Sequence, residues 1–116
     1  MIGIDRKILR ALKVAGNTHT VDDIDKALAE GLMQIWKNDR AVVVTELVHF
    51  PQYNVIRICL AAGDLDAVMA LQPTIEQFGR ENGATKMNMT GREGWAAVLP
   101  KHGWQQDRRV MFEKDI

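Results

Sequence analysis

The hydrophobic residues of this chain gather in its middle, in two apolar stretches that predict β-strands. The stretches AVVVTELVHF (residues 41–50) and VIRICLAA (residues 55–62) are rich in β-branched residues, and a turn at Pro51 separates them. Ahead of them the segment LMQIW (residues 32–36) is followed by the polar turn residues 37–40. Connections this short allow only antiparallel pairing, so we expect a three-stranded meander.

On either side of this predicted sheet, hydrophobic residues recur at helical spacing. Residues 5–14 and 21–30 have the pattern of two short amphipathic helices, the second opened by Thr20 as a capping residue. The spacing becomes helical again over residues 65–82, after the second apolar stretch. Pro73 lies inside this helix, lacks an amide and crowds the preceding turn, so we expect a kink or a break there.

The remaining pattern completes an α+β fold. Residues 85–89 form a strand that follows a helical crossover and should lie parallel to the strand before the helix. A short helix over residues 91–99 and a last strand over residues 104–114 follow. We therefore predict a three-layer α/β/α sandwich with a mixed sheet, in the order helix-helix-β-β-β-α-β-α-β, in a single domain spanning residues 1–116.

Composition narrows the classes of function. The 116 residues carry 15 Lys and Arg against 15 Asp and Glu, so no net charge draws the protein to nucleic acid or to an anionic membrane. Cys59, the single cysteine, excludes an internal disulfide, and three scattered histidines give no metal site. The start of the chain has no secretory signal, and we expect no membrane-spanning segment.

The C-terminal third of the chain carries a run of residues that resembles part of a known family. The run TKMNMTGREGWAAVLPKHGWQQDRRVMFEKDI, with its Gly103-Trp104 pair, resembles the final third of the GNAT superfamily of acyl-CoA-dependent N-acyltransferases. More narrowly, GNTHTVDDI, AVVVTEL, LAAGDLD and GREGW together resemble small uncharacterised GNAT-like proteins of bacteriophages and prophages. The resemblance covers nearly the whole chain in element order and implies a GNAT-like fold.

The resemblance also implies which loop would bind acetyl-CoA. It implies that acetyl-CoA would sit where the strand before the main helix parts from the strand after it, with its pyrophosphate on amides at the helix start. By position, the cofactor-binding residues would be Ala61, Ala62, Gly63, Asp64 and Leu65. A carboxylate about 5 Å from one phosphate charge costs on the order of 3 kcal/mol, and a capping Asp64 would occupy the same amides. We therefore favour a capping role for this loop over cofactor binding.

The chain offers few groups for acid-base catalysis. Many members of the superfamily place a tyrosine one turn before the glycine-aromatic pair to protonate the departing thiolate, and this chain has Leu99 there. Its only tyrosine, Tyr53, lies in the predicted hairpin, and water or His102 would have to substitute. The base candidates are Glu46 and His49, which point to opposite faces of one strand, so only one of them can face the cleft, and Glu46 is the candidate catalytic residue.

Two functions follow from these residues. The first is a phage-encoded GNAT-like protein that has lost catalysis, needs no cofactor and binds phage structural or assembly proteins as a virion, head-assembly or DNA-packaging component. It would reside in the host bacterial cytoplasm or the virion, with no membrane or nucleic-acid partner expected. The alternative is an active acetyl-CoA-dependent N-acetyltransferase that modifies an amine on a host or phage protein. The sequence leaves the oligomeric state open.

Overall fold

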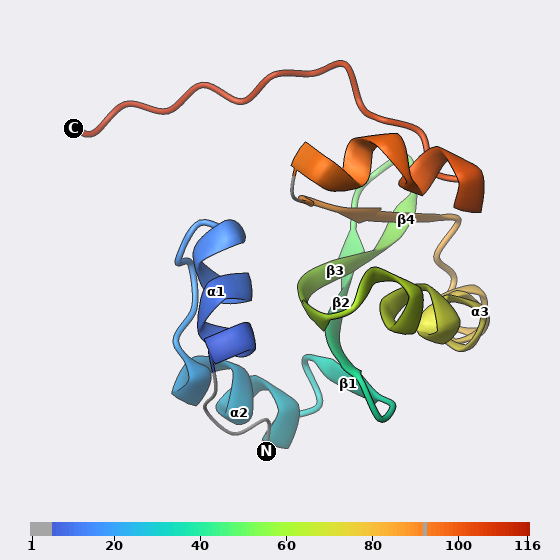
Figure 1. The fold of residues 1–116 in the computed structure, drawn as a ribbon, viewed down its shortest axis with the longest axis horizontal. Coiled ribbons are helices and arrows are strands. Elements are labelled where there is room, and N and C mark those ends of the chain that lie inside the picture. The colour runs from blue at the N-terminus through green and yellow to red at the C-terminus, as the bar shows by residue number, and fades with distance from the viewer. Residues whose placement is uncertain (1–5, 92) are drawn as a thin grey trace.

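A computed structural model describes residues 6–91 and 93–116 of the chain (Figure 1). The helices are α1 (Arg6–Val14), α2 (Val21–Ala29) and α3 (Leu65–Glu81), followed by the 3₁₀ helices η1 (Glu93–Ala97) and η2 (Leu99–His102). The strands are β1 (Gln34–Lys37), β2 (Ala41–His49), β3 (Asn54–Gly63) and β4 (Lys86–Met89). The predicted helix start at residue 5 and the predicted helical residue Arg92 lie outside the described residues.

The four strands form one mixed sheet in the order β1-β2-β3-β4. The first three pair antiparallel as a meander, and β4 pairs parallel to β3, as predicted from the connections. Helices α1 and α2 lie on one face of the sheet and α3 lies on the other (Figure 1). The predicted α+β three-layer fold is therefore confirmed.

Each face of the sheet carries its own hydrophobic core. The core under α3 is built around Val43, Ile56 and Ile58 with Val68 and Ile75 of the helix. The core under α1 and α2 contains a different set: Val44, Leu60, Ala62, Ile8 and Ile24. Full burial of such a side chain contributes about 1.5–3 kcal/mol. Because both faces are buried, β2 and β3 appear in the sequence as nearly continuous apolar runs.

A small polar network lies inside the core under α3. The fully buried hydroxyl of Thr45 accepts a hydrogen bond from Trp36 Nε1 and donates one to Gln34 Oε1, both at 2.9 Å. The ring of Trp36 packs edge-on against Phe78 of α3, with centroids 5.4 Å apart. The network ties the short edge strand β1 to both β2 and α3.

The predicted start of α2 is confirmed as a capping box. Thr20 Oγ1 accepts from the Asp23 amide at 3.1 Å, and the Asp23 carboxylate accepts from the Thr20 amide at 2.8 Å. Two amides that a helix start leaves unpaired are thereby satisfied.

Of the kink or break predicted at Pro73, the break is wrong, because α3 runs through the proline without interruption. A proline inside a helix costs about 3 kcal/mol or more. Val68 and Met69 before it and Ile75 after it are all buried against the sheet. The burial of apolar side chains on both sides of the proline exceeds that local cost.

The last strand, predicted over residues 104–114, is also wrong. Trp104 is held on α3, where its Nε1 donates to Gln72 Oε1 at 3.0 Å. After Trp104 the chain is exposed, forms no strand and extends away from the helices and the sheet (Figure 1). The apolar pattern indicated β-propensity, but no strand in residues 6–91 and 93–116 pairs with the segment.

We predict that Gly63 is required at the junction of β3 and α3. Its φ is +117°, and a Cβ there would lie 2.0 Å from the carbonyl oxygen of Arg40. Gly63→Ala should therefore cost about 3 kcal/mol or more of unfolding free energy, measured by urea denaturation. Gly31→Ala is the control, because Gly31 also has positive φ, +74°, but its Cβ would meet nothing within 4 Å. Equal losses in the two variants would contradict the steric argument.

Candidate functional site

Strands β3 and β4 run side by side for only part of their length. Val55 to Ile58 pair with Lys86 to Met89, and β3 then continues to Gly63 without a β4 partner. The two parallel strands therefore part at their carboxyl ends. In open sheets with parallel strands, that end of a sheet is where ligands commonly bind.

An extra residue in β3 marks the point where the strands part. Val44 lies opposite Leu60, but the next residue, Thr45, lies opposite Ile58, so Cys59 is an insertion in the ladder. Such a β-bulge bends its strand, leaves the backbone of the extra residue out of the ladder and is frequent next to active sites. The bulge therefore turns β3 away from β4 and brings its backbone toward the gap.

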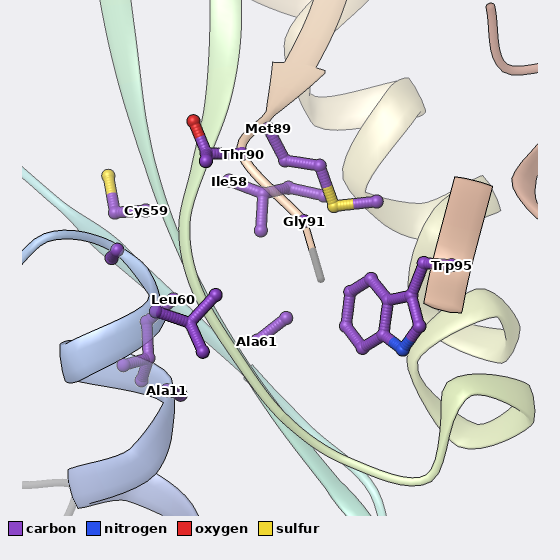
Figure 2. A pocket seen from close by; sticks show the side chains of 11 residues that line it. Ala11, Ile58, Cys59, Leu60, Ala61, Met89, Thr90, Gly91 and Trp95 are labelled. Atoms are coloured by element: carbon purple, nitrogen blue, oxygen red, sulfur yellow. The ribbon is translucent and has the colours of Figure 1, made fainter. Parts of the chain in front are cut away.

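The gap between the strands is a small wedge of about 20 Å³. Figure 2 shows the indole of Trp95 at one side of this wedge, facing Ala61 across it. The other lining residues come from α1, β3 and the end of β4: Ala11, Val14, Ala15, Ile58, Cys59, Leu60, Met89, Thr90 and Gly91. One water needs about 10–15 Å³, so the wedge accommodates a group about the size of a methyl.

Three polar side chains lie together on the face of the sheet beside the wedge. Glu46 of β2 pairs with Arg57 directly opposite on β3, with Oε1 and Nη1 3.6 Å apart. Burial, together with the smaller effects of the nearby Glu46 charge and a hydrogen bond with Glu46, raises the pKa of the Cys59 thiol to about 12. The thiol of Cys59 is therefore protonated at neutral pH and is not a thiolate nucleophile.

The predicted cofactor loop is mostly strand. Ala61, Ala62 and Gly63 belong to β3, where they pair with β2, and Ala61 is the one that lines the wedge. Asp64 occupies the cap position of α3, but its carboxylate makes no capping hydrogen bond. The prediction that Asp64 caps the helix with its side chain is therefore wrong.

The carboxylate of Asp64 is instead drawn toward the hairpin turn between β1 and β2. Its Oδ2 lies 3.5 Å from the guanidinium of Arg40, with both side chains more than half exposed. Asn38 of the same turn donates from Nδ2 to the carbonyl of Ala67 at 2.8 Å. The amides at the helix start are thus not occupied by the Asp64 carboxylate, and Leu65, the last of the predicted loop residues, begins the helix.

The other residues singled out in the sequence lie away from the wedge. Leu99 begins η2 and packs into the core under α3, so no side chain there can transfer a proton. Tyr53 packs against Phe50 in the hairpin, and its ring lies 4.3 Å from Lys86 Nζ. His49 Nδ1 lies 3.0 Å from Asn54 Oδ1 at the far end of β3. Of the predicted catalytic groups, Glu46 is the one that the fold places beside the wedge.

Sequence reasoning missed Cys59 and Trp95 as parts of this site. The GREGW stretch that carries Trp95 was part of the family resemblance and was the available signal for its place. Among the described residues, no group of three metal-ligating side chains comes together and no helix could cross a membrane.

Comparison with solved structures defines the class of fold. A predicted acetyltransferase with acetyl-CoA from Clostridium acetobutylicum matches with a TM-score of 0.62 at 14% identity, over 96% of this chain and 92% of that chain. Glucosamine-6-phosphate N-acetyltransferase from Arabidopsis thaliana matches at 0.61 and 9% identity, over 96% and 94%. An aminoglycoside acetyltransferase in complex with sisomicin, from an uncultured soil metagenomic sample, matches at 0.65 and 11% identity, over 95% and 86%.

These matches establish a GNAT-like acetyltransferase fold for this chain. No family model and no curated protein sequence matches it. The acceptors named for two of the matched proteins, a sugar phosphate and an aminoglycoside, differ in size and charge. The fold alone therefore does not specify a substrate.

We predict that Cys59 reacts slowly with iodoacetamide in the folded protein until the pH is well above 9. The ordinary pKa of the thiol is 9.0 and the folded value is about 12, so the thiolate forms late. Glu46→Gln should shift this reactivity to lower pH, because removal of a negative charge favours the thiolate. Glu113→Gln, in the exposed tail, should leave it unchanged. A folded-state reactivity midpoint near pH 9 would contradict the buried position of the thiol.

Proposed function

We propose that this protein is an acyl-CoA-dependent N-acyltransferase that uses the wedge between β3 and β4 to hold a small acyl group. The observation that carries the proposal is the bulge at Cys59, which parts two parallel strands and opens an apolar wedge beside a carboxylate. The acetyl-CoA named for the Clostridium protein belongs to a matched structure of the same fold. The size of the wedge favours acetyl over longer acyl groups.

The described residues suit the two ends of such a cofactor. In this proposal backbone amides at the bulge would donate hydrogen bonds to a thioester carbonyl in the wedge, where developing negative charge needs stabilisation. Amides at the start of α3 can donate to a diphosphate, and Arg40 beside Asp64 offsets part of the unfavourable carboxylate charge there. Asp66, exposed in the first turn, opposes this binding.

Glu46 is the proposed base for the transfer. In this reaction the amine nitrogen forms a bond to the thioester carbonyl carbon, the carbon–sulfur bond breaks, and the thiol of CoA leaves. Glu46 would take the proton from the amine through a water, held in position by Arg57 across the strands. With Leu99 in place of an acid, solvent water supplies the proton to the leaving thiolate.

A second function, binding without catalysis, is favoured by two of the same observations. Leu99 provides no acid, and Trp95 leaves a wedge of only about 20 Å³. In that function the protein acts through a protein partner, such as the phage virion or head-assembly role expected from the sequence. The two functions differ in whether acetyl-CoA binds and turns over.

We predict that acetyl-CoA stabilises the protein against heat. Ligand at a hundredfold over its dissociation constant should add about 2.7 kcal/mol, visible as a rise in Tm. Ala61→Met should abolish the rise, because the longer side chain fills the wedge that Ala61 lines. Ala70→Met on the exposed face of α3 is the matched control and should keep it. No rise in the parent protein at millimolar acetyl-CoA would exclude acetyl-CoA binding and favour the second function.

We predict that Glu46→Gln lowers turnover without weakening cofactor binding. Loss of a general base reduces kcat by about 10²–10⁴-fold, measured as release of CoA thiol in the presence of a panel of amines. The thermal shift with acetyl-CoA should persist in this variant. Glu30→Gln, at the end of α2, is the control and should retain full activity. Equal turnover in the parent and Glu46→Gln proteins would remove Glu46 from the mechanism.

A further inference from the structure

The walls of the wedge differ in how firmly the fold holds them. Ile58 and Leu60 of β3 are 7% and 2% exposed and belong to the cores on opposite faces of the sheet. Met89 pairs with Ile58 at the end of β4 and packs on the core under α3. Trp95 is only half-buried and stands on η1, a 3₁₀ helix of five residues. Its side chain is therefore the bulky wall that can change with the least effect on either core.

The indole of Trp95 determines how much of the gap between the parted strands stays open. It faces Ala61 across the wedge (Figure 2), at a point where β3 has already left β4. Gly91 lies against the same ring, because a Cβ at Gly91 would be 3.3 Å from the ring carbon Cε3. The ring is thus closely packed, and it leaves a volume of about 20 Å³ in front of Ala61.

We propose that Trp95 limits the acyl group of the cofactor to acetyl. The inference rests on the acyltransferase function proposed above and names the residue that selects the acyl donor. The wedge accepts a methyl group, and each further methylene would have to enter the space that the indole occupies. Because the ring is packed against Gly91, a longer chain meets a wall and not a side chain free to move aside. A smaller residue at position 95 opens the site to butanoyl-CoA and longer thioesters.

The size of the expected effect follows from the surface that each carbon buries. Burial of one methylene tightens binding about fourfold, so the two further methylenes of a butanoyl group tighten it about tenfold or more where there is room for them. Where the indole occupies that room, the same two carbons overpack the site and weaken binding. The order of preference between acetyl and butanoyl thioesters should therefore reverse when the indole is removed.

Binding of a series of thioesters to the full-length protein tests this reversal. The dissociation constants of acetyl-, butanoyl- and hexanoyl-CoA, each divided by the value for free CoA, isolate the contribution of the acyl group. The parent protein should bind acetyl-CoA about tenfold more tightly than butanoyl-CoA, and Trp95→Ala should prefer butanoyl-CoA by a similar factor. Trp95→Leu keeps a larger apolar side chain in place and should give an intermediate preference, so the test does not depend on the folding of the alanine variant.

Trp104→Ala is the matched control for the loss of an indole. Trp104 donates to Gln72 on α3 and does not line the wedge, so this variant should keep the preference for acetyl-CoA. A reversal in Trp104→Ala as large as that in Trp95→Ala would overturn the inference, because the effect would then not come from the wall of the wedge.

The remaining outcomes separate this inference from the function on which it rests. If neither the parent protein nor the two Trp95 variants bind any of the thioesters, the acyltransferase function and this inference both fail. If the parent protein prefers acetyl-CoA and both Trp95 variants keep that preference, the acyltransferase function stands and the role of Trp95 is overturned. Equal affinity of the parent protein for acetyl- and butanoyl-CoA would overturn that role as well.

Discussion

The extra residue at Cys59 is the constraint on which the two cores and the site depend. In a strand, residues two apart point to the same face, yet Ile58 packs under α3 and Leu60 packs under α1 and α2. The insertion between them reverses the facing of every later side chain in β3. Without it, Leu60 would point toward α3, and the core under α1 and α2 would lose its largest side chain from this strand.

The same insertion opens the wedge, so one residue affects both the packing of the two cores and the proposed site. The bend that lets β3 serve both cores is also the bend that carries it away from β4 after Ile58. Gly91 then lets the chain pass close to Trp95, because a Cβ there would lie 3.3 Å from the indole. The indole closes the side of the wedge that the parted strands leave open (Figure 2).

Local signals in the sequence predicted most helices and strands. The features that were not predicted depend on contacts between distant parts of the chain. The meander followed from its short connections, the parallel β4 from the helical crossover before it, and the cap at Thr20 from neighbouring side chains. The bulge could not be predicted, because Arg57 is the one polar side chain of VIRICLAA before Cys59 and only apolar residues follow it, so no alternation marks the insertion. The helix through Pro73 and the missing last strand depended on contacts, made or absent, far along the chain.

The candidate site, like the fold, could be predicted only in part from the sequence. The residue pattern of the strand pointed to Glu46, and the family resemblance pointed to Ala61. Ala61 lines the wedge, and Glu46 lies beside Cys59, which also lines it, because element order fixes the positions of residues within strands. The orientation of Asp64 depended on Arg40, a residue of a different turn, and no local pattern reports such a contact. Trp95 could not be placed, because its position depends on how η1 crosses the end of the sheet.

The side chain of Asn38 links the turn between β1 and β2 to the start of α3, where the cofactor diphosphate is proposed to bind. Its Oδ1 accepts from the amides of Arg40 and Ala41 at 3.0 and 2.9 Å, while its Nδ2 donates to the Ala67 carbonyl. These hydrogen bonds therefore hold the hairpin turn and the first turn of α3 together. A ligand that displaces the start of α3 would also displace the β1–β2 turn. Binding at the start of α3 would therefore change the position of the edge strand β1.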